Sequence, residues 1–520
     1  MYSKGCYMIA AGKKATADGS VMVARSCDST GGGDVVQVLA VPRRSHENGE
    51  SILIPGSDNT VIPQVKETYA YISVMMVREG DDINENEGGI NEFQVTAGAS
   101  TGGYLNPKAS AVCPRMPQSV GDYRMTLALE RCRTAREAVE LMGELTDKYG
   151  ARTDNYIVAD TEEAWFYEEY QGNLWAAARV PDECYVVQAN TVRIDFISDD
   201  PDKFRCSSSL VDFARENGLY DPDRDGDFKP AKVYGAQTGK TRHRIPAPEY
   251  DRRRLWRGIS KLSPSVNPDP EEPSWTYPLF IKPDRKLKPK DFLELFTDRY
   301  EGTDYDVYGK ESHKYSPTVS PMIAQGEQVY EDTPFHINEK RQYQLAPNWG
   351  TERLIGTPRS ITNWCAQLRG WMPNPIGGLF WASIGEGSTT PRIPWYVGVK
   401  KMPEPYRTGT RINRKSPTDY NVYNPESAYW IYRVITNLVN LFYTATKDEV
   451  IPKWREWEET NYRLQEAVEK TALELYEKDP SLATSFITTY SNAKANEALE
   501  TAKKMTTKLH SIISHYNSPL

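Results

Sequence analysis

Short apolar runs separated by turn residues dominate the start of the chain. Residues 6–11 and 21–24 are two such runs, and each is long enough for a buried strand. The Asp18-Gly19 pair lies between them, and Asp-Gly is a strong signal for a tight hairpin turn. The pattern therefore predicts that the chain begins with a β-hairpin.

Further strands follow in the first two hundred residues. Residues 67–77 are rich in β-branched and aromatic side chains, and residues 91–97 are expected to pair with them across a turn at Gly88 and Gly89. Three later runs, separated by short polar turns, predict a three-stranded meander, and a fourth strand ends at Asn190. These later strands are expected at residues 157–160, 164–170, 174–180 and 185–189.

Helical spacing of apolar residues appears in three places. Residues 125–145 carry leucines and alanines at helical intervals, and Gly150 is a plausible end for this single helix. Residues 425–443 and 454–516 keep the same period, apart from a break near Asp479. The last hundred residues are therefore predicted to be helical.

This order of elements indicates an α+β protein, because strands and helices come in groups and do not alternate regularly. Residues 215–290 are rich in Pro, Asp and Arg and predict long loops and short helices that frame a pocket. With 520 residues, the chain has room for a large domain with insertions.

Composition excludes several classes of protein. The hydrophobic fraction of 39% and the charged fraction of 26% are those of a globular chain and not of a disordered or coiled-coil one. The formal net charge of −8 argues against a nucleic-acid partner. No apolar run approaches the length of a membrane span, so we expect no membrane partner.

Cofactor motifs are also missing from the sequence. Seven cysteines include no CxxC pair, six histidines form no HExxH pattern, and neither glycine-rich phosphate motif occurs. We therefore expect no metal and no other cofactor. The cysteines are few for the length of the chain and odd in number, which favours a reducing compartment. The start of the chain lacks a secretion signal, so we expect a cytoplasmic protein, unless a signal peptide has been removed.

Cys6 directly follows Gly5 and opens the first apolar strand. If the bond between these two residues is cut, Cys6 gains a free α-amine beside its thiol. The amine has a reference pKa of roughly 7.7 to 8.0, which suits a general base near neutrality. One residue would then supply both nucleophile and base, although a cysteine near a terminus is more often a small buried hydrophobe.

Several motifs resemble one known family. The start CYMIAAGKKATADGSVMVARSCD resembles that of the dipeptidase A family of cysteine-type N-terminal nucleophile hydrolases, which are related to secernins and more distantly to penicillin V acylases and bile salt hydrolases. The similarity extends to about Tyr406. It is carried further by the G-x-N-E turn at Gly89–Glu92 and by AREAVELM, IVADTEEAWFYEE, RVPDECYVVQANTVRI, TDRYEGTDYD and PRSITNWCAQLRGWMPNPIGGLFWAS.

The resemblance implies a four-layer αββα sandwich and a division of the chain. Residues 1–5 would be a propeptide removed by self-cleavage, residues 6–415 the hydrolase domain, and residues 416–520 a helical region packed on it. Cys6 matches the nucleophile. Arg25 matches the arginine beside the thiolate, and Asp28 matches the carboxylate that holds the α-amine. The alternative for these two residues is an ordinary ion pair on the surface.

The spacing of this pair raises a geometric question. Residues three apart on a regular strand point to opposite faces, so Arg25 and Asp28 face Cys6 together only if the strand ends or bulges near Cys27. The Ser-Thr-Gly-Gly-Gly run that follows makes an ending plausible. Cys27 itself is internal, has no α-amine, and is expected to serve packing.

Asn190 matches the asparagine that donates to the oxyanion, a role worth roughly 2.7 to 4 kcal/mol in other enzymes. The alternative interpretation of Asn190 is that its side chain forms an Asx turn at the end of a strand. The second oxyanion asparagine of the acylases aligns near Ser100 and Thr101, so this chain departs from that branch. A hydroxyl or a backbone N–H is expected to substitute there, beside the substrate.

Three further candidates lie late in the chain. Arg359 is the best match for a remaining superfamily arginine, although Arg353 is close by and a solvated loop arginine is equally expected. Glu301, Asp304 and Asp306 are candidates for binding the ammonium group of a dipeptide, because a buried ammonium needs a carboxylate partner. The alternatives for these acids are a loop held by Asx turns or a cation site.

The resemblance, with these residues at the matching positions, implies a cysteine dipeptidase that hydrolyses amide bonds of short peptides. Dipeptides are thus the expected partners, and the charged C-terminal helices leave a homo-oligomer open. The enzymatic alternative is an acyl-amide hydrolase that acts on N-acyl amino acids or β-lactam side chains. A secernin-like scaffold without catalysis is the alternative from a different class.

Overall fold

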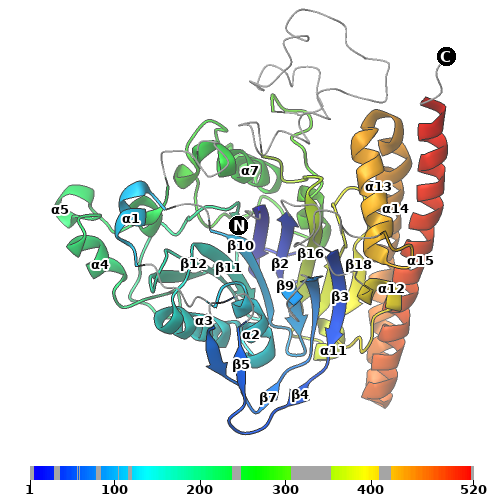
Figure 1. Ribbon diagram of the computed structural model, residues 1–520, viewed down its shortest axis with the longest axis horizontal. Helices are drawn as coiled ribbons and strands as arrows, with labels where there is room; N and C mark the ends of the chain where they lie inside the picture. The colour runs from blue at the N-terminus through cyan, green and yellow to red at the C-terminus, as the bar shows by residue number, and fades with distance from the viewer. Residues whose placement is uncertain are drawn as a thin grey trace, which may run out of the picture.

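A computed structural model describes most of the chain (Figure 1). The described residues are 5–28, 35–54, 57, 59–77, 84–102, 105–114, 120–236, 247–305, 353–408 and 423–516. The predicted propeptide, except Gly5, and Asp306 therefore lie outside them. Among the described helices, none combines the length and the apolar character needed to cross a bilayer.

A six-stranded antiparallel sheet carries both ends of the predicted hydrolase domain. Its strand order is β14-β1-β2-β16-β17-β18, so the first hairpin lies between β14 and β16, and β16 comes more than 300 residues later in the chain. The bounds are β1 Gly5–Ala11, β2 Val21–Asp28, β14 Tyr185–Gln188, β16 Ser360–Leu368, β17 Leu379–Ala382 and β18 Ile393–Tyr396.

An eight-stranded antiparallel sheet has the order β15-β13-β12-β11-β10-β9-β8-β3. It contains the predicted meander, which is confirmed as β11, β12 and β13. The bounds are β3 Val35–Val41, β8 Tyr71–Val77, β9 Asn84–Asn91, β10 Thr96–Thr101, β11 Asp154–Ala159, β12 Ala164–Glu169, β13 Trp175–Arg179 and β15 Phe204–Cys206. Two short pairs stand apart: β4 Arg44–Ser45 with β7 Glu67–Thr68, and β5 Ser51–Leu53 with β6 Val61–Pro63.

Four layers result, as Figure 1 shows. Helices α2 (Tyr123–Arg131) and α3 (Ala135–Tyr149) cover the outer face of the eight-stranded sheet. The two sheets contact each other through β1, β2 and β10. Helices α7 (Ala247–Leu262) and α8 (Pro289–Leu295) pack on strands of the six-stranded sheet. The predicted α+β fold with an αββα sandwich is therefore confirmed.

Small elements complete the chain between these layers. Half of them begin at a proline, whose fixed φ suits the first helical position. Their bounds are α1 Pro107–Val112, α4 Leu210–Glu216, α5 Pro222–Asp225, α6 Pro230–Tyr234, η1 Pro264–Val266, η2 Ser274–Thr276, α11 Asn374–Gly377 and α12 Glu404–Arg407.

The predicted turn at Gly88 and Gly89 is wrong, because both glycines lie inside β9. A Cβ atom on Gly88 would come within 2.2 Å of the Trp364 ring, and one on Gly89 within 2.4 Å of the Ile72 carbonyl oxygen. The glycines are thus required by close packing and not by a turn. The reversal comes later, between Asn91 and β10.

The single helix predicted over residues 125–145 is two helices in the structure. α2 ends at Arg131, and α3 begins after Thr134, whose side chain accepts a hydrogen bond from the Glu137 N–H. This N-cap breaks the chain although the apolar spacing continues. Gly150 ends α3 as predicted, with a φ of 74°.

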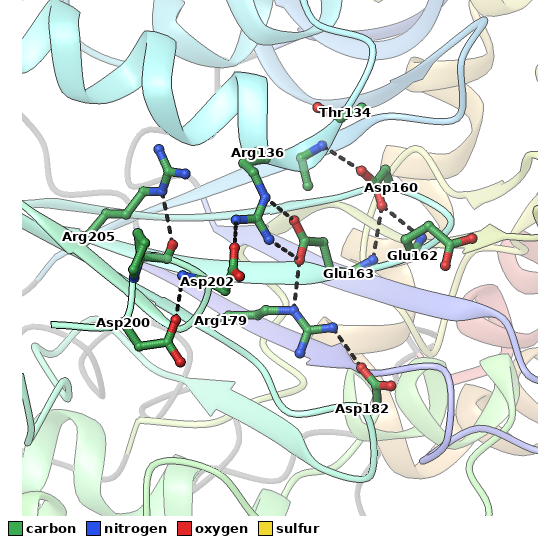
Figure 2. A network of polar contacts seen from close by, with 12 residues as sticks. Thr134, Arg136, Asp160, Glu162, Glu163, Arg179, Asp182, Asp200, Asp202 and Arg205 are labelled. Atoms are coloured by element: carbon green, nitrogen blue, oxygen red, sulfur yellow. Dashed lines mark hydrogen bonds and ion pairs between the residues drawn. The ribbon is translucent and has the colours of Figure 1, made fainter. Parts of the chain in front are cut away.

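A polar network fixes the start of α3 to the eight-stranded sheet (Figure 2). Asp160, in the β11–β12 turn, accepts a hydrogen bond from the Ala135 N–H at 2.8 Å. Glu163 accepts hydrogen bonds from both Arg136, on α3, and Arg179, on β13. These contacts tie one helix to three strands at the rim of the sheet.

The helical C-terminal region is confirmed as α13 (Ala428–Leu441), α14 (Tyr443–Lys478) and α15 (Pro480–Tyr516), with the predicted break at Asp479. These helices run beside the six-stranded sheet (Figure 1), and α15 contacts β18. Arg392 forms a buried ion pair with Glu458 of α14 at 3.1 Å. The region is therefore packed on the sheet and is not an appended arm.

Candidate active site

Cys6 lies near the start of β1, with its side chain only 1% exposed. It is paired with Cys27 of β2 across the antiparallel ladder. Directly opposed residues point to the same face of a sheet, so the two thiols are neighbours. Arg25, two residues before Cys27, shares this face.

Arg25 brings a positive charge to the thiol. Its Nη2 lies 3.4 Å from the Cys6 sulfur and 2.8 Å from a carboxylate oxygen of Glu87 in β9. Burial raises the pKa of Cys6, but a hydrogen bond from the Cys27 thiol and the charge of Arg25 outweigh it and lower the pKa to about 7. These two contacts thus favour the thiolate form of Cys6, which is the nucleophilic form of a cysteine.

Asn190 holds the backbone nitrogen of Cys6. It follows β14 with a φ of 62°, a conformation that asparagine adopts more readily than most residues. Its Oδ1 accepts a hydrogen bond from the Cys6 N–H at 3.0 Å, and its Nδ2 donates to the Thr101 carbonyl at 2.8 Å. Ser100 donates to Gln188, which also accepts from the Asn190 N–H, so Ser100 and Thr101 both lie beside Asn190. A role for either residue at the oxyanion stays a prediction.

Arg254 completes this cluster from α7, inside the segment predicted to be loops and short helices. Its Nη1 donates to the Cys6 carbonyl at 2.9 Å and to the Asn190 Oδ1 at 3.0 Å, while Nη2 donates to the Ala189 carbonyl. Sequence analysis missed this helix because it contains few apolar residues and has four arginines. The run of arginines itself was the available signal.

Asp28 ends β2 directly opposite Gly5. The strand continues regularly past Cys27, and the register shift lies in the neighbouring β16. Arg25 and Asp28 therefore lie on opposite faces of β2, and only Arg25 contacts the thiol. The Asp28 carboxylate accepts a hydrogen bond from Arg353, a residue that the sequence analysis named only as a neighbour of Arg359.

The remaining candidates lie outside this cluster. Arg359 is half-buried before β16 and contributes its charge to the surroundings of Asp28. Glu301 and Asp304 are exposed. Glu301 lines a cavity of about 210 Å³ together with Arg299 and Tyr443, and its carboxylate accepts a hydrogen bond from the Arg299 N–H. A role for these residues in substrate binding stays a prediction.

Glu87 is a second residue that sequence analysis missed. It is 1% exposed, and its backbone carbonyl accepts hydrogen bonds from Arg25 and from the Trp364 ring nitrogen. The surrounding sequence ENEGG is typical of an exposed loop, which hid a buried carboxylate. Within the described part of the chain, no cluster of three or more His, Cys, Asp or Glu residues is arranged to hold a metal ion.

A wide groove of about 1050 Å³ lies elsewhere. It is bordered by Ala17 and Asp18 in the β1–β2 turn and by residues of α8 and α14. This turn is at the opposite end of the hairpin from Cys6. The groove is thus separate from the thiol cluster.

Comparisons with known proteins identify a peptidase. The family model described as peptidase family C69 matches residues 5–456. The chain belongs to this family, which confirms the family predicted from the sequence.

The chain is also similar to named relatives and to parts of solved structures. A probable dipeptidase from Latilactobacillus sakei is 27% identical over 445 residues, which cover 85% of this chain and 82% of the relative. Dipeptidase A from Lactobacillus helveticus is 26% identical, with 84% of each chain covered. A mutant conjugated bile acid hydrolase from Clostridium perfringens is 11% identical, covers 35% of this chain and 52% of its own, and has a TM-score of 0.22.

Proposed function

We propose that the protein is a cysteine dipeptidase whose nucleophile is Cys6, made N-terminal by cleavage of the Gly5–Cys6 bond. One observation carries the proposal. A single residue has its sulfur 3.4 Å from the Arg25 guanidinium and its backbone nitrogen hydrogen-bonded to Asn190 at 3.0 Å. Both reactive groups of an N-terminal cysteine are thus held by separate partners.

The chemistry follows from these contacts. The thiolate attacks the peptide carbonyl, and the carbonyl oxygen takes up the electron pair. Asn190 Nδ2 has two hydrogens, of which one bonds to Thr101, so the second is available for this oxyanion. The protonated α-amine then gives its proton to the leaving amine, and the thioester forms.

Deacylation reverses these roles. Water attacks the thioester carbonyl and gives a proton to the Cys6 α-amine, which now acts as general base. The carbon–sulfur bond breaks, the acid product leaves, and the thiolate is restored. No cofactor is needed for either half of the reaction.

Dipeptides are proposed as substrates because the named relatives are dipeptidases. Hydrolysis of a panel of dipeptides, compared with a panel of N-acyl amino acids, tests this choice. We expect the dipeptides to be cleaved, and exclusive cleavage of the acylated substrates would favour the acyl-amide hydrolase instead. A cytoplasmic location and a homo-oligomer remain predictions.

The nucleophile is tested by Cys6→Ser. We expect kcat to fall by about a thousandfold or more, because a hydroxyl beside the same amine is far less ionised than a thiol. Cys184→Ser, at a half-buried cysteine outside the cluster, is the matched control and should retain activity. Full peptidase activity in Cys6→Ser would refute the mechanism, and an inactive wild type would favour the scaffold.

A further inference from the structure

The carboxylate of Asp28 has two oxygens in different surroundings. The residue is 2% exposed, and Oδ2 accepts a hydrogen bond from Nη2 of Arg353. Within the described residues, Oδ1 is buried and has no hydrogen-bond partner. An unpaired buried carboxylate oxygen is costly, so this arrangement calls for a donor that is absent from the uncleaved chain.

Such a donor arises beside Asp28 when the leader is removed. Asp28 is opposite Gly5 in the β1–β2 ladder, next to the bond that must be cut to free Cys6. Cleavage converts the Cys6 N–H into an ammonium group with three donors, of which Asn190 already accepts one. The unpaired oxygen is therefore suited to the new ammonium.

We propose that Arg353 is a positioning residue that holds Asp28 ionised and turned so that its second oxygen receives the Cys6 ammonium. This role rests on the proposed function. Arg353 acts through Asp28 and is not proposed to touch the substrate.

Arg353 is itself fixed by a chain of contacts. Tyr300 donates a hydrogen bond to the Arg353 carbonyl at 2.5 Å, and the Tyr300 N–H donates to Asp298 at 2.9 Å. Asp298 accepts from Arg257 of α7 at 2.8 Å. Arg254, one turn earlier on the same helix, binds the Cys6 carbonyl. Helix α7 thus contacts the Cys6 carbonyl directly through Arg254, and it is linked to the backbone of Arg353 through Asp298 and Tyr300.

The electrostatics agree with this role. Burial raises the pKa of Asp28, and Arg353 is the strongest of the opposing charges, followed by Arg254, Arg359 and Arg25. The Cys6 thiol, on the neighbouring strand β1, repels the Asp28 carboxylate when both groups are ionised. Loss of Arg353 is therefore expected to leave Asp28 protonated up to a higher pH.

The test is the pH profile of kcat/KM in the full-length chain. We expect the acid limb of Arg353→Met to move up by about one pH unit, so that activity falls about tenfold at the acid end and recovers at alkaline pH. Arg353→Lys should shift less, because it keeps a charge. Arg433→Met, at a half-buried arginine that donates to the Pro358 carbonyl, is the control and should keep the wild-type profile.

A second comparison introduces Arg353→Met into an Asp28→Asn background. Asp28→Asn removes the buried negative charge that, without Arg353, would hinder folding. In this background, Arg353→Met should cause no further shift. An unchanged profile in Arg353→Met, or an equal shift with and without Asp28, would overturn the proposal. A wild type that hydrolyses no amide substrate contradicts the proposed function, whereas an active wild type with an unchanged variant contradicts only the role of Arg353.

Discussion

The sulfur of Cys6 is surrounded by groups that favour its ionised form although it is buried. Arg25 supplies a full positive charge and Cys27 a neutral donor. Sequence reasoning assigned Cys27 to packing, because an internal cysteine has no α-amine. The structure pairs Cys27 with Cys6, and its thiol donates a hydrogen bond that lowers the pKa of Cys6.

The donor role of Cys27 predicts a change in pH dependence. In the proposed mechanism the Cys6 thiolate is the reactive form, so we expect the rate to rise as pH passes the Cys6 pKa of about 7. Cys27→Ala removes a stabilising hydrogen bond, and we expect the acid limb of kcat/KM to move up by about half to one pH unit. Cys27→Ser should shift less, since a hydroxyl also donates.

Cys365→Ala is the matched control for this experiment. Cys365 is a buried thiol in β16, opposite Ala24 of β2 and outside the Cys6 pair. Its loss should leave the acid limb in place. An acid limb that is the same in Cys27→Ala and the wild type would show that the Cys27 thiol does not act on Cys6.

Among the elements, α7 determines whether the cluster is complete. It packs closely on β1, because Gly258 leaves room for the Tyr7 hydroxyl. Strands β1, β2 and the meander were predictable, since their apolar runs are long and bounded by turn residues. α7 was not, because its inward face carries arginines, whose partners come from distant parts of the chain.

The packing of α7 is tested by Gly258→Ala. A Cβ atom there would lie 1.8 Å from the Tyr7 oxygen, so the helix must shift or the buried ring must move. We expect a loss of about 1 to 3 kcal/mol in the free energy of unfolding, measured by urea titration, and a lower kcat as Arg254 moves. Ser260→Ala on the same helix is the control. Unchanged stability and activity in Gly258→Ala would contradict close packing at this point.

In the whole molecule, the cluster is assembled from segments that are far apart in sequence. Cys6 and Arg25 come from the first hairpin, Asn190 from the strand at its edge, and Arg254 and Arg353 from two later segments. The family resemblance brought out the first three, because their motifs survive in the sequence. Arg353 was named only beside Arg359, and Arg254 was missed, because both make contacts across more than 200 residues, which one sequence does not display.

The central claim is that Cys6 becomes the N-terminal residue. Intact mass with N-terminal sequencing of the wild type and of Cys6→Ala, prepared in the same way, tests it directly. We predict that the wild type begins at Cys6, whereas Cys6→Ala retains residues 1–5 because its thiol is needed to cleave the bond. If both proteins keep these residues, Cys6 has no free amine, the proposed base does not exist, and the account is contradicted.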